Sequence, residues 1–199
     1  MPRLVDPLLL PGSVASIQQP LLEIDDRFSI RPWAIDDAPT IVVAYSDPEI
    51  QQWHRRALDD FEAQQMVRIW RGAWQGEADA CWAIENRLDG LAVGYIALHR
   101  IDLENGAAQV AYWVAPHARS DGVASKATLA LSEWALGPLG LHRLELLHSV
   151  HNHASCHVAA NAGFAIEGTL KGALEHPDGW HDMHLHARLT SKPFRSPIS

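Results

Sequence analysis

The segment from Val110 to Leu136 constrains the fold most, because it predicts a strand, a tight turn and a helix in direct succession. Residues Val110 to Val114 form an apolar and aromatic run typical of a strand, and Pro116 interrupts it. After Gly122 the apolar residues recur at helical spacing, as Val123, Ala127, Leu131 and Trp134. The end of a strand must therefore lie beside the start of a half-buried helix, with only a short turn between them.

The turn from Arg119 to Ala124 is rich in small residues and leads into the start of the predicted helix. Backbone N–H groups at a helix N-terminus point outward and attract anions such as phosphate. An ordinary strand-to-helix turn contains similar residues, so the rest of the chain has to decide between the two interpretations. The spacing Arg119-x-x-Gly122-x-Ala124 resembles the pyrophosphate-binding segment of the GCN5-related N-acetyltransferases (GNAT), which hold acetyl-CoA there.

A second motif lies about 30 residues further along the chain, where Asn152, Ser155 and the pair Gly163-Phe164 follow a predicted strand. This spacing resembles the second CoA motif of GNAT enzymes, in particular the RimJ/RimL type of ribosomal-protein N-acetyltransferase. The resemblance extends over roughly residues 28–189. It implies an acyl-CoA-dependent N-acyltransferase with acetyl-CoA, or another acyl-CoA, as co-substrate.

The periodicity of the remaining segments agrees with the fold that this resemblance implies. We expect an α/β fold with a mixed, mostly antiparallel GNAT sheet of about seven strands and about four flanking helices. A strand–helix–strand crossover is expected at the CoA site. Strands are predicted near residues 27–31, 81–85, 91–99, 109–114, 141–150, 164–174 and 181–189. The predicted organisation is an N-terminal arm (1–22), one GNAT domain (23–190) and a C-terminal tail (191–199).

The charge balance excludes some functions and favours others. Sixteen Lys and Arg against 24 Asp and Glu give a net charge of −8, which disfavours nucleic-acid binding and suits an amine-bearing acceptor. Only two cysteines, Cys81 and Cys156, are present, and they are too far apart in sequence to indicate a disulfide framework. The apolar run at residues 8–10 is far too short for a signal peptide or a spanning helix. We therefore expect a cytoplasmic protein that acts neither on nucleic acid nor at a membrane.

The resemblance assigns roles to individual residues of the two motifs. It implies that the turn binds the pyrophosphate through Arg119, Ser120, Asp121, Gly122, Val123, Ala124 and Ser125. It also implies that the strand end Tyr112, Trp113 and Val114 diverges from its neighbour at residues 144–148 and binds the pantetheine arm. Asn152 would bond the pantetheine, and Ser155 would lie beside the sulfur as a proton donor. An N-cap and a first-turn position explain these last two residues as well.

The general base is harder to assign, because two positions depart from the family pattern. Gln109 stands where many relatives carry a Glu, and Leu174 stands where some RimL-like enzymes carry a second carboxylate. Glu175 is adjacent to Leu174, but neighbouring residues of a strand face opposite sides. The catalytic candidates are therefore Ser155 as acid, with Glu175 and His148 as bases, while His99 and Glu145 remain as alternatives.

Twelve histidines, several of them two residues apart as in His151-x-His153 and His184-x-His186, raise the question of a metal site. No carboxylate or thiolate stands at a recognised ligand spacing from them, so we expect no metal. The histidines near the acceptor cleft would instead shape it. Four tryptophans are candidates for lining the acceptor pocket: Trp53, Trp70, Trp74 and Trp180.

The expected function is transfer of an acetyl group to a primary amine by direct attack in a ternary complex. The amine is either a protein N-terminal α-amine or a small molecule, because the fold alone does not choose between them. Two alternatives remain, a relative that uses succinyl-CoA and a CoA-binding regulatory module without transferase activity. Gln109 and Leu174 favour the regulatory module, and a homodimer is left open.

Overall fold

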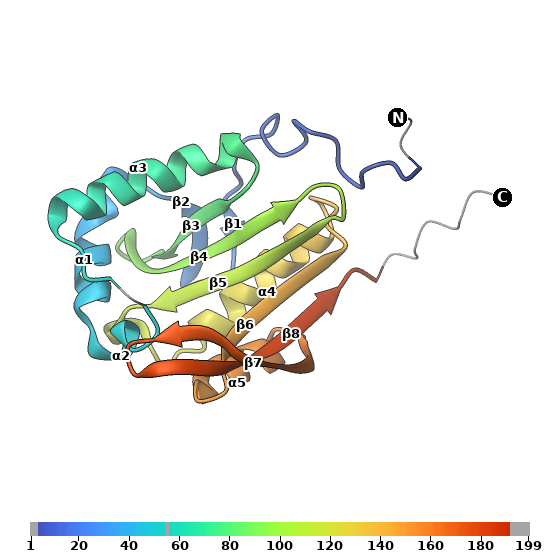
Figure 1. The fold of residues 1–199 in the computed structure, drawn as a ribbon. Coiled ribbons are helices and arrows are strands. Elements are labelled where there is room, and N and C mark those ends of the chain that lie inside the picture. Colours follow the sequence, from blue (N-terminus) through green and yellow to red (C-terminus); the bar gives the residue numbers. More distant parts are fainter. Residues whose placement is uncertain (1–3, 55, 192–199) are drawn as a thin grey trace.

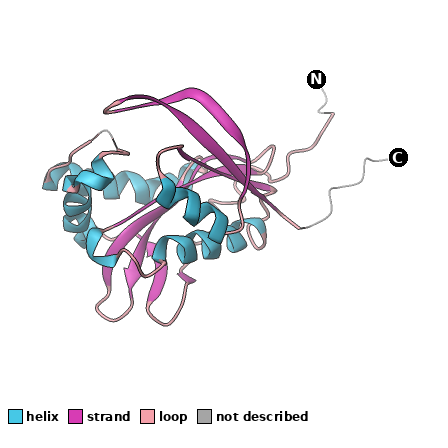
Figure 2. Cartoon of the chain, turned by 90° about the horizontal axis from the view of Figure 1, so that it is seen from below, coloured by secondary structure: helices cyan, strands magenta, loops and turns pink. Residues whose placement is uncertain are grey.

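The computed structural model describes residues 4–54 and 56–191, which form a single eight-stranded sheet with helices on both faces (Figures 1 and 2). The strands are β1 (Leu22–Glu23), β2 (Phe28–Pro32), β3 (Ala80–Asn86), β4 (Leu91–Asp102), β5 (Ala107–Val114), β6 (Arg143–Ser149), β7 (Ala165–His176) and β8 (Gly179–Leu189). The α-helices are α1 (Ala38–Ser46), α2 (Pro48–Gln51), α3 (Asp60–Gly76), α4 (Val123–Leu136) and α5 (His153–Asn161), with short 3-10 turns η1 (Ile35–Asp37) and η2 (Pro116–Ala118).

The strand order is β1-β2-β3-β4-β5-β6-β8-β7, and among the described strands only β5 and β6 pair in parallel. The helix α4 makes the crossover between these two strands, as a parallel pair requires. The prediction of a mixed, mostly antiparallel sheet is therefore confirmed. The strand beyond the expected seven is the two-residue β1, which lies across the predicted boundary between the arm and the domain. The expected tail 191–199 lies outside the described residues, apart from Ser191.

Two hydrophobic clusters pack on opposite faces of the sheet. One joins the sheet to α4 and α5 through residues such as Val123, Leu131 and Ala159. The other joins it to α1 and α3 through residues such as Ile41 and Val67. No helix within the described part of the chain has the length and apolar character needed to cross a membrane.

The residues at both ends of the helix α3 explain where it begins and ends. The carboxylate of Asp59 accepts the N–H of Glu62 and the Glu62 side chain accepts the N–H of Asp59, so the two residues form a capping box. The helix ends at Gly76, and the next residue, Glu77, adopts a left-handed conformation with φ of 55°. This conformation turns the Glu77 side chain back toward the N-terminal part of the chain.

The described residues of the expected arm pack on the domain through Glu77. Its carboxylate accepts backbone N–H groups from Gly12, Val14 and Ala15 at 2.6–3.0 Å. The side chain of Val14 is only 1% exposed and belongs to the core of the α4 face. Further along the arm, the indole of Trp74 donates to the carbonyl of Ile17. The arm is therefore part of the folded domain in this region.

Replacing Glu77 with Gln is expected to loosen this contact. The amide keeps one acceptor oxygen but loses the negative charge. The free energy of unfolding should therefore fall by roughly 1 kcal/mol, and the loss is no larger because Glu77 remains partly exposed to solvent. Urea denaturation would measure the loss, and hydrogen exchange at Gly12 to Ala15 should accelerate. Glu133→Gln, at an exposed side chain, is the matched control and should change neither quantity. Unchanged exchange in Glu77→Gln would contradict the assignment.

Candidate functional site

The strands β5 and β6 separate after three residue pairs, and this separation opens the site. They pair at Ala107–Arg143, Ala108–Leu144 and Gln109–Glu145. Beyond these pairs β5 stays bonded to β4 as far as Val114, and β6 stays bonded to β8 as far as Ser149. The facing edges of the two strands are thus left to line a cavity of about 470 Å³. The predicted divergence of these strands is confirmed.

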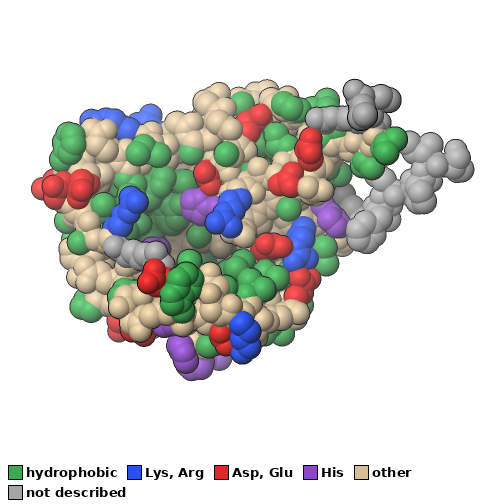
Figure 3. Space-filling model, in the orientation of Figure 1, with side chains coloured by type: hydrophobic (Ala, Val, Ile, Leu, Met, Phe, Trp, Pro, Cys, Tyr) green, Lys and Arg blue, Asp and Glu red, His purple; other side chains and the backbone are tan. Residues whose placement is uncertain are grey.

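The cavity runs between three structural regions. Its walls are residues 110–114 of β5 and 146–149 of β6, the starts of α4 and α5, and side chains from α2 and the β7–β8 hairpin. On the face of the molecule seen in Figure 3, hydrophobic side chains gather in a hollow that charged and histidine side chains border. A cavity of this kind suits a long, mostly apolar ligand with polar ends.

The predicted anion-binding turn has the backbone geometry that such a site needs. Ser120 and Gly122 both adopt left-handed conformations, with φ of 73° and 69°, and Gly122 is the N-cap of α4. The N–H of Lys126 donates to the carbonyl of Gly122. The preceding N–H groups of the first helical turn, from Val123 to Ser125, therefore have no intrahelical acceptor. They point out of the helix toward the end of the cavity lined by Ala124.

The side chains of Arg119 and Asp121 are engaged with neighbouring charges. The guanidinium of Arg119 pairs with Asp47 at 2.6 Å and with Glu49 at 2.5 Å, and its Nε donates to the carbonyl of Val114. Arg119 thereby connects the end of β5 to α2, while still lining the cavity. The carboxylate of Asp121 pairs with Arg27 on the surface at 2.8 Å.

Three polar side chains meet at the start of α5. The Oδ1 atom of Asn152 accepts the N–H of Ser155 at 3.0 Å, so the predicted N-cap is confirmed, and both residues line the cavity. The hydroxyl of Tyr112 is buried and has no well-formed hydrogen bond within the described residues. Burial raises the pKa of Tyr112 to about 12, although the neighbouring Ser155 hydroxyl lowers it in part. Tyr112 therefore keeps its proton beside Ser155 at neutral pH.

Aromatic and imidazole rings line the other end of the cavity. Trp53 and His176 lie there edge to face with ring centroids 5.7 Å apart, and His54 and Leu174 complete the wall. We call this region the acceptor end. Of the four tryptophans predicted for it, the structure places only Trp53 in the cavity wall.

The other three tryptophans lie elsewhere, so their prediction was wrong. Trp70 is buried in the α3 face against Trp33. Trp74 packs near the end of α3 against Trp82, within the cluster of the opposite sheet face. Trp180 is 67% exposed at the tip of the last hairpin. Apolar residues at helical spacing predict that one side of a helix is buried, but they do not predict which part of the protein that side packs against.

The two predicted bases differ in their relation to the cavity. His148 is 5% exposed and lines the cavity. Its Nδ1 bonds the carbonyl of Ser149 at 2.8 Å and its Nε2 lies 3.1 Å from Nε2 of His186. Burial lowers the pKa of His148, which favours the neutral ring. Glu175 is outside the cavity wall, whereas its neighbours Leu174 and His176 are in it, as the strand alternation predicts.

The alternative bases His99 and Glu145 do not line the cavity either, and each is bonded to a neighbouring side chain. The ring of His99 bonds Asp79 at 2.6 Å, and Glu145 pairs with Arg143 at 2.8 Å.

A chain of polar groups at the acceptor end was not predicted from the sequence. The hydroxyl of Ser149 bonds Nδ1 of His181 at 2.7 Å, and Nε2 of His181 lies 2.9 Å from the carboxylate of Asp178. The ring of His176 lies 4.4 Å from that of His181. Side-chain alternation along the β7–β8 hairpin places His176 and His181 on the same face. The contact with Ser149, however, arises because β6 lies beside β8 in the sheet, and the sequence does not show this order.

Burial of His54 is expected to make stability depend on pH. Burial, and then repulsion from His176, lower its pKa below the ordinary value of 6.5. The unfolded chain therefore binds the proton more tightly, so stability is fully present above pH 6.5 and falls as the pH drops below that value. The free energy of unfolding, measured by urea denaturation at a series of pH values below 6.5, should depend less steeply on pH in His54→Gln than in the wild type. The exposed His157→Gln should keep the wild-type slope; equal slopes in all three proteins would refute the prediction.

Comparison with known proteins places this geometry in context. The family model of the acetyltransferase (GNAT) domain matches residues 27–165. The chain is 33% identical over 97 residues to the ribosomal-protein-serine acetyltransferase of Escherichia coli, which covers 49% of this chain and 54% of that protein. It is 26% identical over 149 residues to the uncharacterized N-acetyltransferase p20 of Bacillus licheniformis, and the alignment covers 73% of this chain and 83% of that protein. The chain thus spans only about half the length of the Escherichia coli protein.

The fold also resembles that of a solved structure, RimL ribosomal L7/L12 alpha-N-protein acetyltransferase in complex with coenzyme A. The TM-score is 0.78 at 21% sequence identity, and the alignment covers 85% of this chain and 98% of the other. At this identity the likeness concerns the fold. The strand separation and the helix start described above therefore occur within a fold that holds coenzyme A in that protein.

Proposed function

The chain belongs to the acetyltransferase (GNAT) domain family, and on this basis we propose that it is an N-acetyltransferase that transfers an acetyl group from acetyl-CoA to a primary amine. The observation that carries the proposal is the cavity between β5 and β6, which leads from the N-terminus of α4 to the acceptor end. Acyl-CoA requires an anion site, a narrow channel and a place for a second substrate, and this cavity offers them in that order.

The anion site would bind the pyrophosphate of the co-substrate. The outward N–H groups of Val123, Ala124 and Ser125, with the backbone of Ser120 and Gly122, supply donors and the positive end of a helix dipole. Arg119 contributes chiefly by fixing α2 to the end of β5, since its guanidinium pairs with two carboxylates.

The separated strand edges would bind the pantetheine arm. Residues Tyr112, Trp113 and Val114 line the cavity on the edge that no longer pairs with β6. Their backbone amides can bond the amides of pantetheine as a neighbouring strand would. The side-chain amide of Asn152 lies in the same wall, and its nitrogen can donate while its oxygen caps α5.

Proton transfer to the departing thiolate would come from the start of α5. Ser155 is the proposed donor to the sulfur, and the protonated Tyr112 hydroxyl beside it can replace the proton that Ser155 gives up. The proposal thus gives Tyr112 a second role beyond lining the pantetheine channel.

The acceptor amine must be neutral when it attacks, so a base is needed near the acceptor end. We place this role on the imidazoles of the cavity wall. The ring of His54 is neutral at pH 7 because burial lowers its pKa, and His176 lies beside the His181–Asp178 pair. His148 is also in the wall, but its Nε2 is engaged with His186. Glu175 lies outside the wall, so we carry it no further as a base.

A second candidate function is a CoA-binding module that does not transfer the acyl group. The observation in its favour is Leu174, an apolar residue in the cavity wall where some related enzymes have a carboxylate. Either function uses the same co-substrate site, so turnover distinguishes them.

The deciding experiment is mass spectrometry of reactions with acetyl-CoA or succinyl-CoA and a panel of amines. The panel contains peptides beginning with Ser, Ala or Thr, polyamines and aminoglycosides, and free thiol is measured in parallel. We expect thiol release with an equal amount of acetylated amine. A serine-terminated peptide is the first acceptor to test, since the Escherichia coli relative is named for ribosomal-protein serine. Bound CoA without turnover on any amine would favour the second candidate.

Replacing Ser155 with Ala should slow the chemical step more than it weakens CoA binding. Loss of a positioned proton donor typically lowers the rate by about 10²–10⁴-fold, so single-turnover rates should fall while the Kd for CoA changes little. The exposed Ser46→Ala, whose hydroxyl bonds only the carbonyl of Val42 among described groups, is the control. A wild-type single-turnover rate in Ser155→Ala would remove Ser155 from the mechanism.

A further inference from the structure

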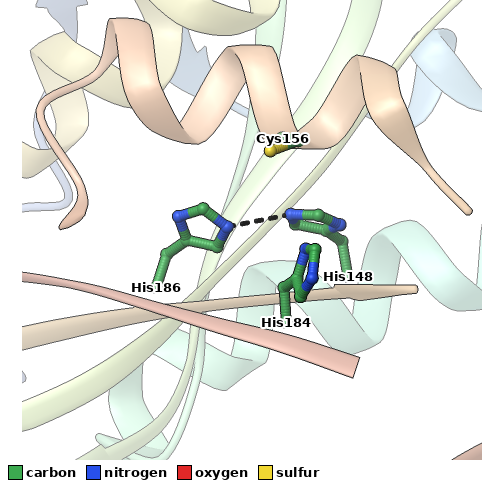
Figure 4. A group of neighbouring side chains, drawn as sticks. All are labelled: His148, Cys156, His184 and His186. Atoms are coloured by element: carbon green, nitrogen blue, oxygen red, sulfur yellow. Dashed lines mark hydrogen bonds between the residues drawn. The ribbon is translucent and has the colours of Figure 1, made fainter. Parts of the chain in front are cut away.

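Four side chains that are separated in sequence meet between the sheet and α5. They are His148 of β6, His184 and His186 of β8, and Cys156 of α5 (Figure 4). Each offers one nitrogen or sulfur atom, and these four atoms all lie within 4.8 Å of one another. We refer to them as the His3Cys cluster.

Sheet order brings the four residues together. The strands β6 and β8 are antiparallel neighbours, and His148 is the direct cross-strand partner of His184. His186 is two residues along the same strand, so it shares the face of His184. The helix α5 packs over this face, and Figure 4 shows Cys156 directed from the helix toward the three imidazole rings.

The polar groups of the cluster satisfy one another only in part, through one hydrogen bond between His148 and His186 (Figure 4). The Nδ1 atoms of His184 and His186 are buried and have no well-formed hydrogen bond within the described residues, although the backbone of Phe164 lies near the His186 ring, and His186 is only 3% exposed. Nδ1 of His148 must donate to the carbonyl of Ser149, which can only accept, so the Nε2 of the neutral ring presents a lone pair. This lone pair accepts the N–H of Nε2 of His186, 3.1 Å away, and a metal ion can take the place of that proton. Buried polar atoms without partners are unfavourable, so their concentration here calls for a ligand.

We propose that the His3Cys cluster binds one zinc ion, through one ring nitrogen of each histidine and the thiolate of Cys156. Three imidazoles and one thiolate form a donor set that suits Zn²⁺, and a magnesium or calcium ion would require oxygen ligands. On binding, the ion exchanges four of its water ligands for the three ring nitrogens and the Cys156 sulfur, and the Cys156 thiol releases its proton to solvent. The hydrogen bond between His148 and His186 is lost, and a ring whose proton lies on the ligating nitrogen carries it on the other nitrogen instead. Neighbouring ligand atoms in tetrahedral zinc sites are about 3.3–3.6 Å apart. The widest separation in the cluster, up to 4.8 Å, must therefore shorten by roughly 1.2–1.5 Å, whereas the Nε2 atoms of His148 and His186, 3.1 Å apart, are already close enough.

Four protein ligands would close the coordination sphere, which makes the site structural. The ion would fix α5 to β6 and β8 through Cys156, which is one residue after Ser155 and four residues after the N-cap Asn152. A metal-bound His148 could not act as a general base, so this proposal removes His148 from the catalytic candidates. It also departs from the expectation of no metal, which was based on spacing in the sequence alone.

The test uses the full-length chain without an affinity tag, stripped with a chelator and titrated with Co²⁺ as a spectroscopic probe. We expect one Co²⁺ per chain, with the visible bands of tetrahedral cobalt and a near-ultraviolet thiolate-to-cobalt band, all abolished when Zn²⁺ displaces the cobalt. Cys156→Ser should lose the thiolate band. His186→Gln removes a proposed direct ligand. It should therefore weaken Co²⁺ binding by more than the roughly 10–100-fold that is typical when a group that only hydrogen-bonds a ligand is lost.

The matched control is His157→Gln, because His157 is exposed and adjacent to Cys156 on the same helix. It should bind Co²⁺ like the wild type. Equal loss of binding in the control, or an unchanged spectrum in Cys156→Ser, would overturn the proposal and indicate adventitious binding at surface histidines.

A second measurement uses only the unaltered chain, so it does not depend on whether the variants fold. Stoichiometric Zn²⁺ should protect Cys156 from alkylation by iodoacetamide and should raise the thermal midpoint, because the ion binds only the folded chain. Alkylation of Cys156 at the same rate with and without Zn²⁺ would overturn the proposal. None of these readouts involves acetyl transfer, so the outcome is separate from that of the proposed function.

Discussion

The early separation of two parallel strands is the constraint on which the rest of the structure depends. Backbone donors and acceptors that leave a sheet must find other partners, and β5 and β6 part after only three pairs. Each strand remains bonded to its other neighbour, β4 or β8, so the facing edges stay extended and available. A sheet that was paired throughout would have no cavity, and the starts of α4 and α5 would have nothing to face.

The two helices that begin at this opening are positioned by different means. Gly122 gives α4 a left-handed N-cap without a side-chain bond, which leaves the first-turn N–H groups exposed. Asn152 gives α5 a side-chain cap that satisfies the N–H of Ser155. The N-terminus of α4 is thus suited to bind an anion, whereas the N-terminus of α5 fixes the position of the Ser155 hydroxyl. Arg119, in the turn before α4, connects this turn to α2 through its ion pairs with Asp47 and Glu49.

Features set by local chemistry could be predicted from the sequence. The capping box at Asp59 and Glu62, the cap at Asn152 and the divergence beside Tyr112 each follow from residues close together in the chain or from a motif. Features that depend on which elements become neighbours could not be predicted. Trp74 packs on the opposite sheet face, and the His3Cys cluster draws ligands from three elements, so no spacing along the chain reveals it.

The distribution of the tryptophans has a practical consequence for optical measurements. Trp53 and Trp113 line the cavity, whereas Trp74, Trp82 and Trp134 pack together elsewhere with neighbouring ring centroids 5.7–6.2 Å apart. A molecule that enters the cavity would displace water from the partly exposed Trp53, whereas Trp113 is only 4% exposed, and it would leave the second group untouched. The intrinsic fluorescence of the chain therefore combines an emitter that senses occupancy with an internal reference.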